Sequence, residues 1–122
     1  MTTQKEEFIT EFKKRTKNFS LKIIKLFQSL PKTEEAKTIG RQLLRSATSV
    51  AANYRAVCRS RSKAEFFAKL SITVEEADES ALWLELLIES EISNSSFAGA
   101  LLKESEEITA VLSKARKTTS GN

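Results

Sequence analysis

The fold of this chain is decided by residues 62–90, SKAEFFAKLSITVEEADESALWLELLIES. Apolar side chains recur there at steps of three and four residues, which is the period of one face of an α-helix. Ser62 and Glu65 have the spacing of a capping box, in which the hydroxyl and the carboxylate each accept a backbone amide at the start of a helix. The stretch therefore predicts a helix from Lys63 to about Ser90.

The same period predicts three more helices outward from this one. The first covers about residues 4–29 and ends before Pro31, because proline lacks an amide donor and disfavours helix in the preceding residue. The second begins after Thr33, which is followed by two carboxylates that favour a helix N-terminus, and ends before residue 59. The last begins near Phe97, after a cluster of serines and an asparagine.

Length and composition agree with a helical domain. The chain has 122 residues with only three glycines and one proline, which is too little turn material for a sheet of many strands. Four amphipathic helices with short connections pack most simply as an antiparallel up-down-up-down bundle, so the fold class is all-α. Residues 1–117 are expected to form one domain, and residues 118–122 a disordered tail without an apolar anchor.

Several function classes are excluded by missing residue types. The chain has no histidine and one cysteine, Cys58, so an intrachain disulfide, a Cys/His zinc site and a histidine general base are all impossible. The acidic residues at 75–79 lack the Glu-x-x-His pairs of bundle metal sites, which makes them partners for basic groups instead. We therefore expect no enzyme, no cofactor and no metal. We also expect no membrane span and a cytoplasmic location.

Charge is distributed unevenly along the chain. Residues 1–69 contain 16 Lys+Arg and 6 Asp+Glu, whereas residues 70–122 contain 4 and 10, which leaves a net charge of +4. Such asymmetry favours either an anionic partner such as nucleic acid or attraction between neighbouring copies. Both interpretations stay open on the sequence alone.

Basic residues in two clusters are the candidates for phosphate contacts. Arg41 and Arg45 have a different interpretation, because a hairpin turning near residue 61 places Arg45 opposite residue 77, within reach of Glu76 and Asp78. These four residues are expected to form structural ion pairs. The nucleic-acid candidates are Lys13, Lys14, Lys17, Lys22, Lys25, Arg55, Arg59, Arg61 and Lys63.

Three runs together resemble a known family. They are FSLKIIKLFQSLPK at residues 19–32, QLLRSATSVAANYRAVCRSRSKAEFFAKL at residues 42–70 and EEADESALWLELL at residues 75–87. This order is similar to that of the bacterial four-helix-bundle family named after proteins encoded in 23S rRNA intervening sequences. The resemblance implies a homo-oligomer, with relatives that form pentameric rings. It also implies a likeness to the accessory protein of diversity-generating retroelements, a basic pentamer that binds nucleic acid and a reverse transcriptase.

Two functions follow as hypotheses. The first is a non-catalytic oligomer that binds RNA or DNA through the basic helices, as an accessory to a reverse transcriptase or to ribosomal RNA. The alternative is a structural homo-oligomer or protein-protein adaptor, in which the basic face is used for self-assembly.

Overall fold

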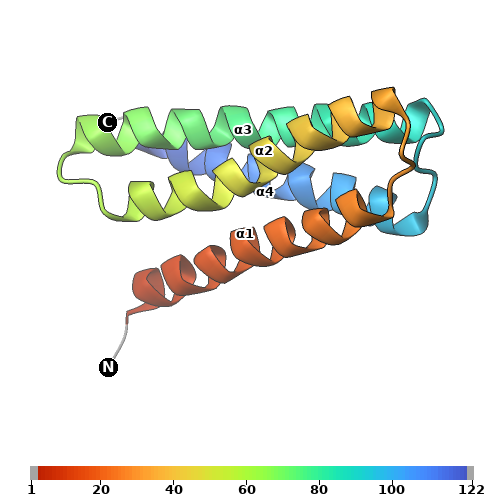
Figure 1. Cartoon of the computed structure of the whole chain (residues 1–122). Coiled ribbons are helices and arrows are strands. Elements are labelled where there is room, and N and C mark those ends of the chain that lie inside the picture. Colours follow the sequence, from red (N-terminus) through yellow and green to blue (C-terminus); the bar gives the residue numbers. More distant parts are fainter. Residues whose placement is uncertain (1–2, 121–122) are drawn as a thin grey trace.

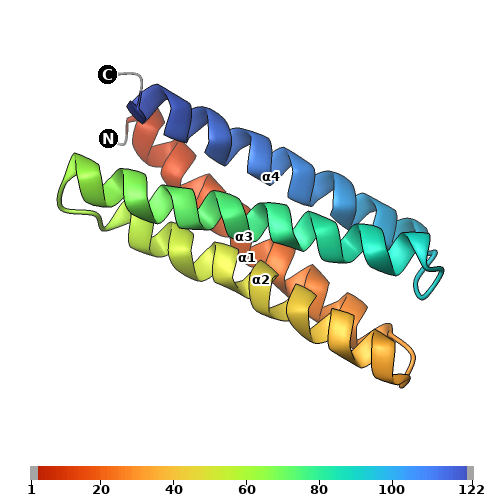
Figure 2. The same cartoon turned by 90° about the horizontal axis from the view of Figure 1, so that it is seen from above.

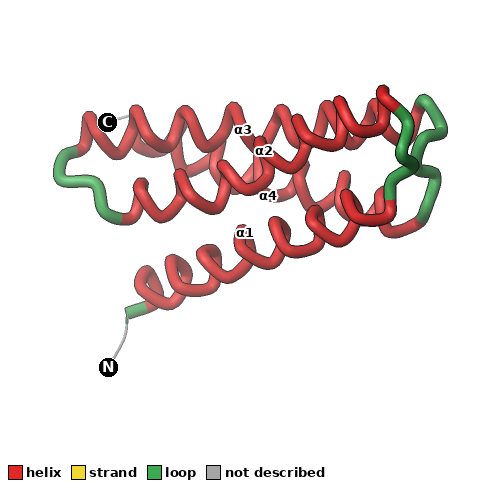
Figure 3. The backbone as a smooth tube through the Cα atoms, in the orientation of Figure 1, coloured by secondary structure: helices red, strands yellow, loops and turns green. Residues whose placement is uncertain are grey.

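The chain folds into four long helices joined by short connections. The computed structural model describes residues 3–120, and within this range it contains α1 (Gln4–Ser29), α2 (Glu34–Cys58), α3 (Lys63–Glu89) and α4 (Ser96–Ser120) and no strand (Figure 1). Figure 3 shows that loops occupy only the helix ends and the three connections. The prediction of an all-α chain with four helices is confirmed.

The helices form a bundle in which each one packs against two others. α2 contacts α1 and α3, and α4 contacts α3 and α1. The colours of Figure 1 show that the chain reverses direction at every connection, so α1 and α3 run in the same direction. Seen from above, α1 lies behind α3 and between α2 and α4 (Figure 2). The helices α1 and α3 therefore occupy opposite corners of the bundle.

Local sequence signals set the helix starts. The hydroxyls of Thr33 and Ser62 accept backbone amides at the start of α2 and α3, as their position before the apolar stripes predicts. Of the capping box predicted at Ser62, the structure shows the serine half. The complete box is at the start of α1, where Thr3 Oγ1 accepts from the amide of Glu6 at 3.0 Å and the Glu6 carboxylate accepts from the amide of Thr3 at 3.4 Å.

The core is closest-packed between α2 and α3. Small side chains there let the two helices approach, and the hydroxyls of Ser46 and Ser80 lie 2.9 Å apart in the buried contact. Gly40 serves the neighbouring contact with the end of α1, because a Cβ atom at this position would lie 2.9 Å from Leu30 Cδ1. Gly40 therefore serves as a close packing position inside the continuous helix α2.

The N-terminal part of α1 diverges from the bundle (Figure 1). Phe8, which the apolar stripe predicts to be in the core, is 53% exposed and stacks on Phe12 with ring centroids 5.7 Å apart. Behind these rings lies an apolar cavity of about 330 Å³ that reaches Tyr54 and Leu70. Phe8 is exposed although it falls on the apolar face of α1, because periodicity defines a helix face but not whether another helix covers it.

The C-terminal helix continues beyond its predicted end. The disordered tail predicted at residues 118–122 is corrected for residues 118–120, since α4 extends to Ser120. Thr118 and Thr119 donate hydrogen bonds to the carbonyls of Lys114 and Ala115, and neither glycine nor proline occurs between Gly99 and Gly121. Residues 121–122 lie outside the described range. Within that range, every helix is too polar to cross a membrane.

Candidate nucleic-acid interface

All nine basic residues that the sequence proposes for phosphate contacts have exposed side chains. They do not form one surface. The lysines of α1 point in several directions around the helix, and Lys22, for example, lines a hollow beside α4 together with Arg15 and Glu104. A cationic surface must therefore be defined from the residues that share a groove.

One such groove lies between α1 and α2. It is lined by Lys17, Arg55 and Arg59, with Leu21 at its edge. Thr48, Ala51 and Ala52 on α2 also line it, and these small side chains leave the groove between the two helices open. The arrangement places three cations along one depression of the surface.

A second hollow continues this groove around the turn between α2 and α3. It is lined by Arg59, Arg61 and Lys69, together with Ala56 and Glu65. Arg59 belongs to both depressions, so they form one continuous surface. We call it the basic strip, and its members are Lys17, Arg55, Arg59, Arg61 and Lys69.

Lys69 belongs to this strip but is not among the candidates proposed from the sequence. Lys69 follows Glu65 by one helical turn and therefore lies on the same side of α3, facing the end of α2. The spacing of four residues between Glu65 and Lys69 is the sequence signal from which this position of Lys69 could have been predicted. Lys63, which the sequence does propose, is exposed at the start of α3 but lines a different depression, with Ala64 and Phe67.

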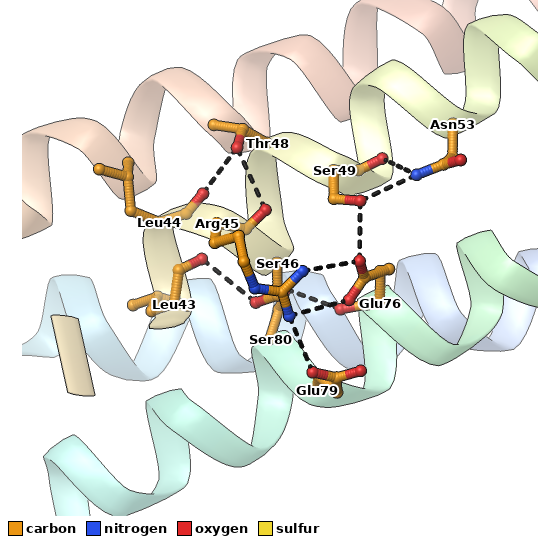
Figure 4. Close-up of polar contacts among 10 residues, drawn as sticks. All are labelled: Leu43, Leu44, Arg45, Ser46, Thr48, Ser49, Asn53, Glu76, Glu79 and Ser80. Atoms are coloured by element: carbon orange, nitrogen blue, oxygen red, sulfur yellow. Dashed lines mark hydrogen bonds and ion pairs between the residues drawn. The ribbon is translucent and has the colours of Figure 1, made fainter. Parts of the chain in front are cut away.

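The arginine in the middle of α2 has a different environment. Arg45 donates hydrogen bonds to Glu76 at 3.0 Å and to Glu79 at 3.0 Å, both on α3 (Figure 4). Glu76 also accepts a hydrogen bond of 2.8 Å from Ser49. Burial disfavours the charged form of Glu76, but the hydrogen bonds from Arg45 and Ser49 outweigh it, and the pKa of this carboxyl is lowered from its ordinary 4.5.

The other two predicted ion-pair residues are not part of this cluster. Arg41 and Asp78 are exposed, and no ion pair of either is found among residues 3–120. Asp78 follows Glu76 by two residues, which places it about 200° around α3 and away from α2. The prediction for Arg41 and Asp78 is therefore corrected, whereas Arg45 and Glu76 form the pair that the hairpin geometry predicts.

A second neutralised arginine connects α1 to α4. Arg15 donates to Glu104 at 2.7 Å and to Glu107 at 2.8 Å. The hydrogen bond to Glu104 raises the pKa of Arg15 against the opposing effect of burial. By contrast, no ion pair involves a residue of the basic strip within the part of the chain that the structure describes.

Comparison with known proteins supports the resemblance seen in the sequence. The family model for the 23S rRNA-intervening sequence protein matches residues 10–114, which is most of the chain. The chain belongs to this family. A solved structure from the S23 ribosomal protein family of Bacteroides thetaiotaomicron, described as a protein of unknown function, superposes with a TM-score of 0.79 at 33% sequence identity. The similarity covers 86% of this chain and 97% of that one. No curated protein matches the chain.

The matched residues of this intervening-sequence family member include the whole basic strip. They also include Tyr54 and Cys58, which both line the cavity behind Phe8 and Phe12. Burial, and after it the adjacent Cys58 thiol, raises the pKa of Tyr54. Among residues 3–120 no group of acidic or sulfur side chains has the arrangement of a metal site.

Proposed function

We propose that this family member binds nucleic acid through the phosphate groups of the backbone and performs no catalysis. The observation that carries the proposal is the basic strip, in which five cations share one continuous surface without a carboxylate partner in the described residues. Arginine and lysine side chains without a carboxylate partner remain hydrated and available. When they contact phosphates, counterions are released from the nucleic acid.

The contrast within the bundle supports this choice of residues. Arg15 and Arg45 already form ion pairs with carboxylates, so a phosphate would have to displace those partners. Arg55, Arg59 and Arg61 carry no such cost. Phosphate contacts position a nucleic acid without reading its bases, so we expect binding with little sequence preference.

The test is RNA binding measured by fluorescence anisotropy with a labelled single strand of about 20 nucleotides at several salt concentrations. The triple variant Arg55→Ala, Arg59→Ala, Arg61→Ala should lose on the order of tenfold or more in affinity. Its plot of log affinity against log salt should become shallower by about 2, since each phosphate contact to a single strand contributes about 0.7.

The matched control removes three exposed lysines at the opposite end of the bundle. Lys32→Ala, Lys37→Ala, Lys103→Ala has the same change in net charge, and it should bind RNA within about twofold of the unaltered protein. Equal affinity of the unaltered protein and the arginine variant at about 50 mM salt contradicts the proposal.

A second candidate function is self-assembly of a structural homo-oligomer. A specific observation favours it, namely that large apolar side chains on α1 and α3 are exposed. The pentameric ring that the family resemblance implies is one form that such an assembly could take. The two functions are compatible if they use different faces of the bundle.

A further inference from the structure

The cavity behind Phe8 and Phe12 is built into the core of the bundle. Its volume is about 330 Å³, and all four helices contribute side chains to its wall. Four of the lining residues belong to the core, since Phe12, Tyr54, Leu70 and Leu112 are between 1% and 6% exposed. The cavity is therefore more than a surface groove, and its volume lies at the lower end of the roughly 300 to 1,000 Å³ typical of small-molecule sites.

The cavity is open at one end and closed at the other. Along α1, Lys5 and Phe8 are exposed, Ile9 is half-buried and Phe12 is buried, because the helix diverges from the bundle toward its N-terminus (Figure 1). The ring of Phe12 packs edge-on against Tyr54 with the centroids 4.8 Å apart, which closes the inner end. The entrance therefore lies at the start of α1.

The two ends of the cavity also differ in polarity. The start of α1 and the end of α2 lie at the same end of the bundle (Figure 1), so Lys5, Cys58 and Ser60 line the open end. Phe12 and Leu70 line the closed end. No ion pair of Lys5 is found among residues 3–120. An unneutralised ammonium at the entrance of an apolar space is complementary to a molecule with an apolar body and an anionic end.

Tyr54 supplies a further polar group to this site. The residue is 6% exposed, and the partner of its hydroxyl within the described residues is the thiol of Cys58, one helical turn closer to the open end. A thiol is a weak hydrogen-bonding group, whereas buried tyrosine hydroxyls usually have a stronger partner. The Tyr54 hydroxyl is therefore available as a donor to a ligand oxygen.

The length of the cavity indicates the shape of the ligand. Lys5 and Phe12, which line its two ends, are seven residues apart on α1, and this spacing corresponds to about 10 Å along the helix axis. An extended covalent chain advances by about 1.2 Å per bond, so roughly eight bonds cover this distance. An unbranched hydrocarbon chain of about eight to ten carbons has the required length.

We propose that this cavity binds a medium-chain carboxylate, with the hydrocarbon chain directed toward Phe12 and the carboxylate beside Lys5 and the Tyr54 hydroxyl. Removing the chain from water supplies most of the affinity. The carboxylate stays at the entrance, where it keeps part of its hydration and loses little free energy by desolvation. A cationic end group at the same place would be repelled by Lys5.

The first test is calorimetric titration of the protein with straight-chain carboxylates at concentrations where they remain monomeric. Decanoate should bind with a Kd on the order of 100 μM. From hexanoate to decanoate the affinity should rise about fourfold per methylene, and it should level off in longer chains, because the length of the cavity is then used. Equal affinity for hexanoate and decanoate, or no binding of decanoate, overturns the proposal.

The location of the ligand is tested by filling the cavity. Ala115→Phe places a ring among the lining residues and should lower the affinity for decanoate by about tenfold or more. The matched control is Ala110→Phe, the same substitution at an exposed position of α4 outside the cavity, which should bind decanoate within about twofold of the unaltered protein. Equal affinities of the two variants overturn the assignment to this cavity.

The role of Lys5 is tested with a charge series. Lys5→Ala should weaken the binding of decanoate by about two- to fivefold and leave that of decanol unchanged, since the lost ion pair is at the surface. Lys103→Ala removes the same charge at the other end of the bundle and should have no effect. Decyltrimethylammonium bound as tightly as decanoate contradicts the proposed position of the anionic end.

Cys58 offers a readout that does not depend on calorimetry. It is the only cysteine of the chain and lines the cavity, so a bound chain should shield its thiol. Saturating decanoate should slow the reaction of Cys58 with a soluble thiol reagent several-fold, and this protection should be lost in Ala115→Phe. An unchanged reaction rate at saturating decanoate places the ligand elsewhere and overturns the proposal.

Discussion

The middle and the end of α2 carry arginines in opposite electrostatic states. Arg45, in the middle, meets two carboxylates of α3, whereas Arg59, near the end, lies by the start of α3, where Glu65 is accompanied by Lys69. The helix pair is the same and the residue type is the same. What differs is the charge of the stretch of α3 that lies opposite, so the position along the hairpin decides which arginines are neutralised.

This difference separates two uses of positive charge. In the middle of α2 the charge holds two helices together through hydrogen bonds in a partly buried contact. At the end of α2 it faces solvent and contributes little to folding, which leaves it for a phosphate partner.

The largest expected effect on stability comes from removing the carboxylate that pairs with Arg45 in the middle of α2. Glu76→Ala deletes the acceptor of both Arg45 and Ser49, and it should lower the free energy of unfolding by about 1 to 2 kcal/mol. Urea denaturation measures this change. Asp78→Ala, on the same helix and away from α2, is the control and should change stability by less than about 0.5 kcal/mol. Equal losses for the two variants contradict the assignment.

Lowering the pH should gradually remove the stabilisation that the ionised Glu76 carboxylate provides. The folded-state pKa of Glu76 lies below its ordinary 4.5, so its stabilising effect is complete above that value and is lost as pH falls through the lowered pKa. Unfolding curves of the unaltered protein and of Glu76→Gln between pH 7 and pH 3 should therefore converge at the acid end. A constant difference over this range contradicts the role of the ionised carboxylate.

The smallest effects on stability come from the arginines themselves, and the loss should be larger for the arginine in the middle of α2 than for the one at its end. Arg45→Ala should cost roughly 0.5 to 1 kcal/mol, a modest value because the guanidinium is half exposed. Arg59→Ala should change the free energy of unfolding by no more than about 0.3 kcal/mol, since only its position at the helix C-terminus is favourable. A loss for Arg59→Ala as large as that for Arg45→Ala indicates a partner that the basic strip is proposed to lack.

Most of the fold is predictable because it depends on local signals. The apolar period and the capping hydroxyls of Thr33 and Ser62 fix the helix starts without reference to the rest of the chain. Phe8 and the end of α4 are the exceptions. Phe8 depends on how closely α1 follows the bundle, and residues 118–120 continue α4 because neither glycine nor proline interrupts the helix there before Gly121.

The candidate site was predictable in part. Counting residues outward from the turn near residue 61 places Arg45 opposite residue 77 and next to Glu76, and the structure shows the ion pair of Arg45 and Glu76. Such a count gives the position along the axis of α3 but not the direction in which a side chain points. It therefore included Asp78 and omitted Glu79, which does pair with Arg45. It likewise gave no reason to join Lys17 of α1 to Arg59 of α2, which share a groove only through helix packing.

The sequence by itself determined that the chain is helical, where the helices begin, and that positive charge gathers in the first half. Only the tertiary structure decided which of those charges are neutralised and which outer rows of α1 and α3 are exposed. The physical reason is geometric. A sequence fixes the angle of each side chain around its own helix, but an ion pair requires two helices to bring charged atoms within about 4 Å, and that depends on their packing.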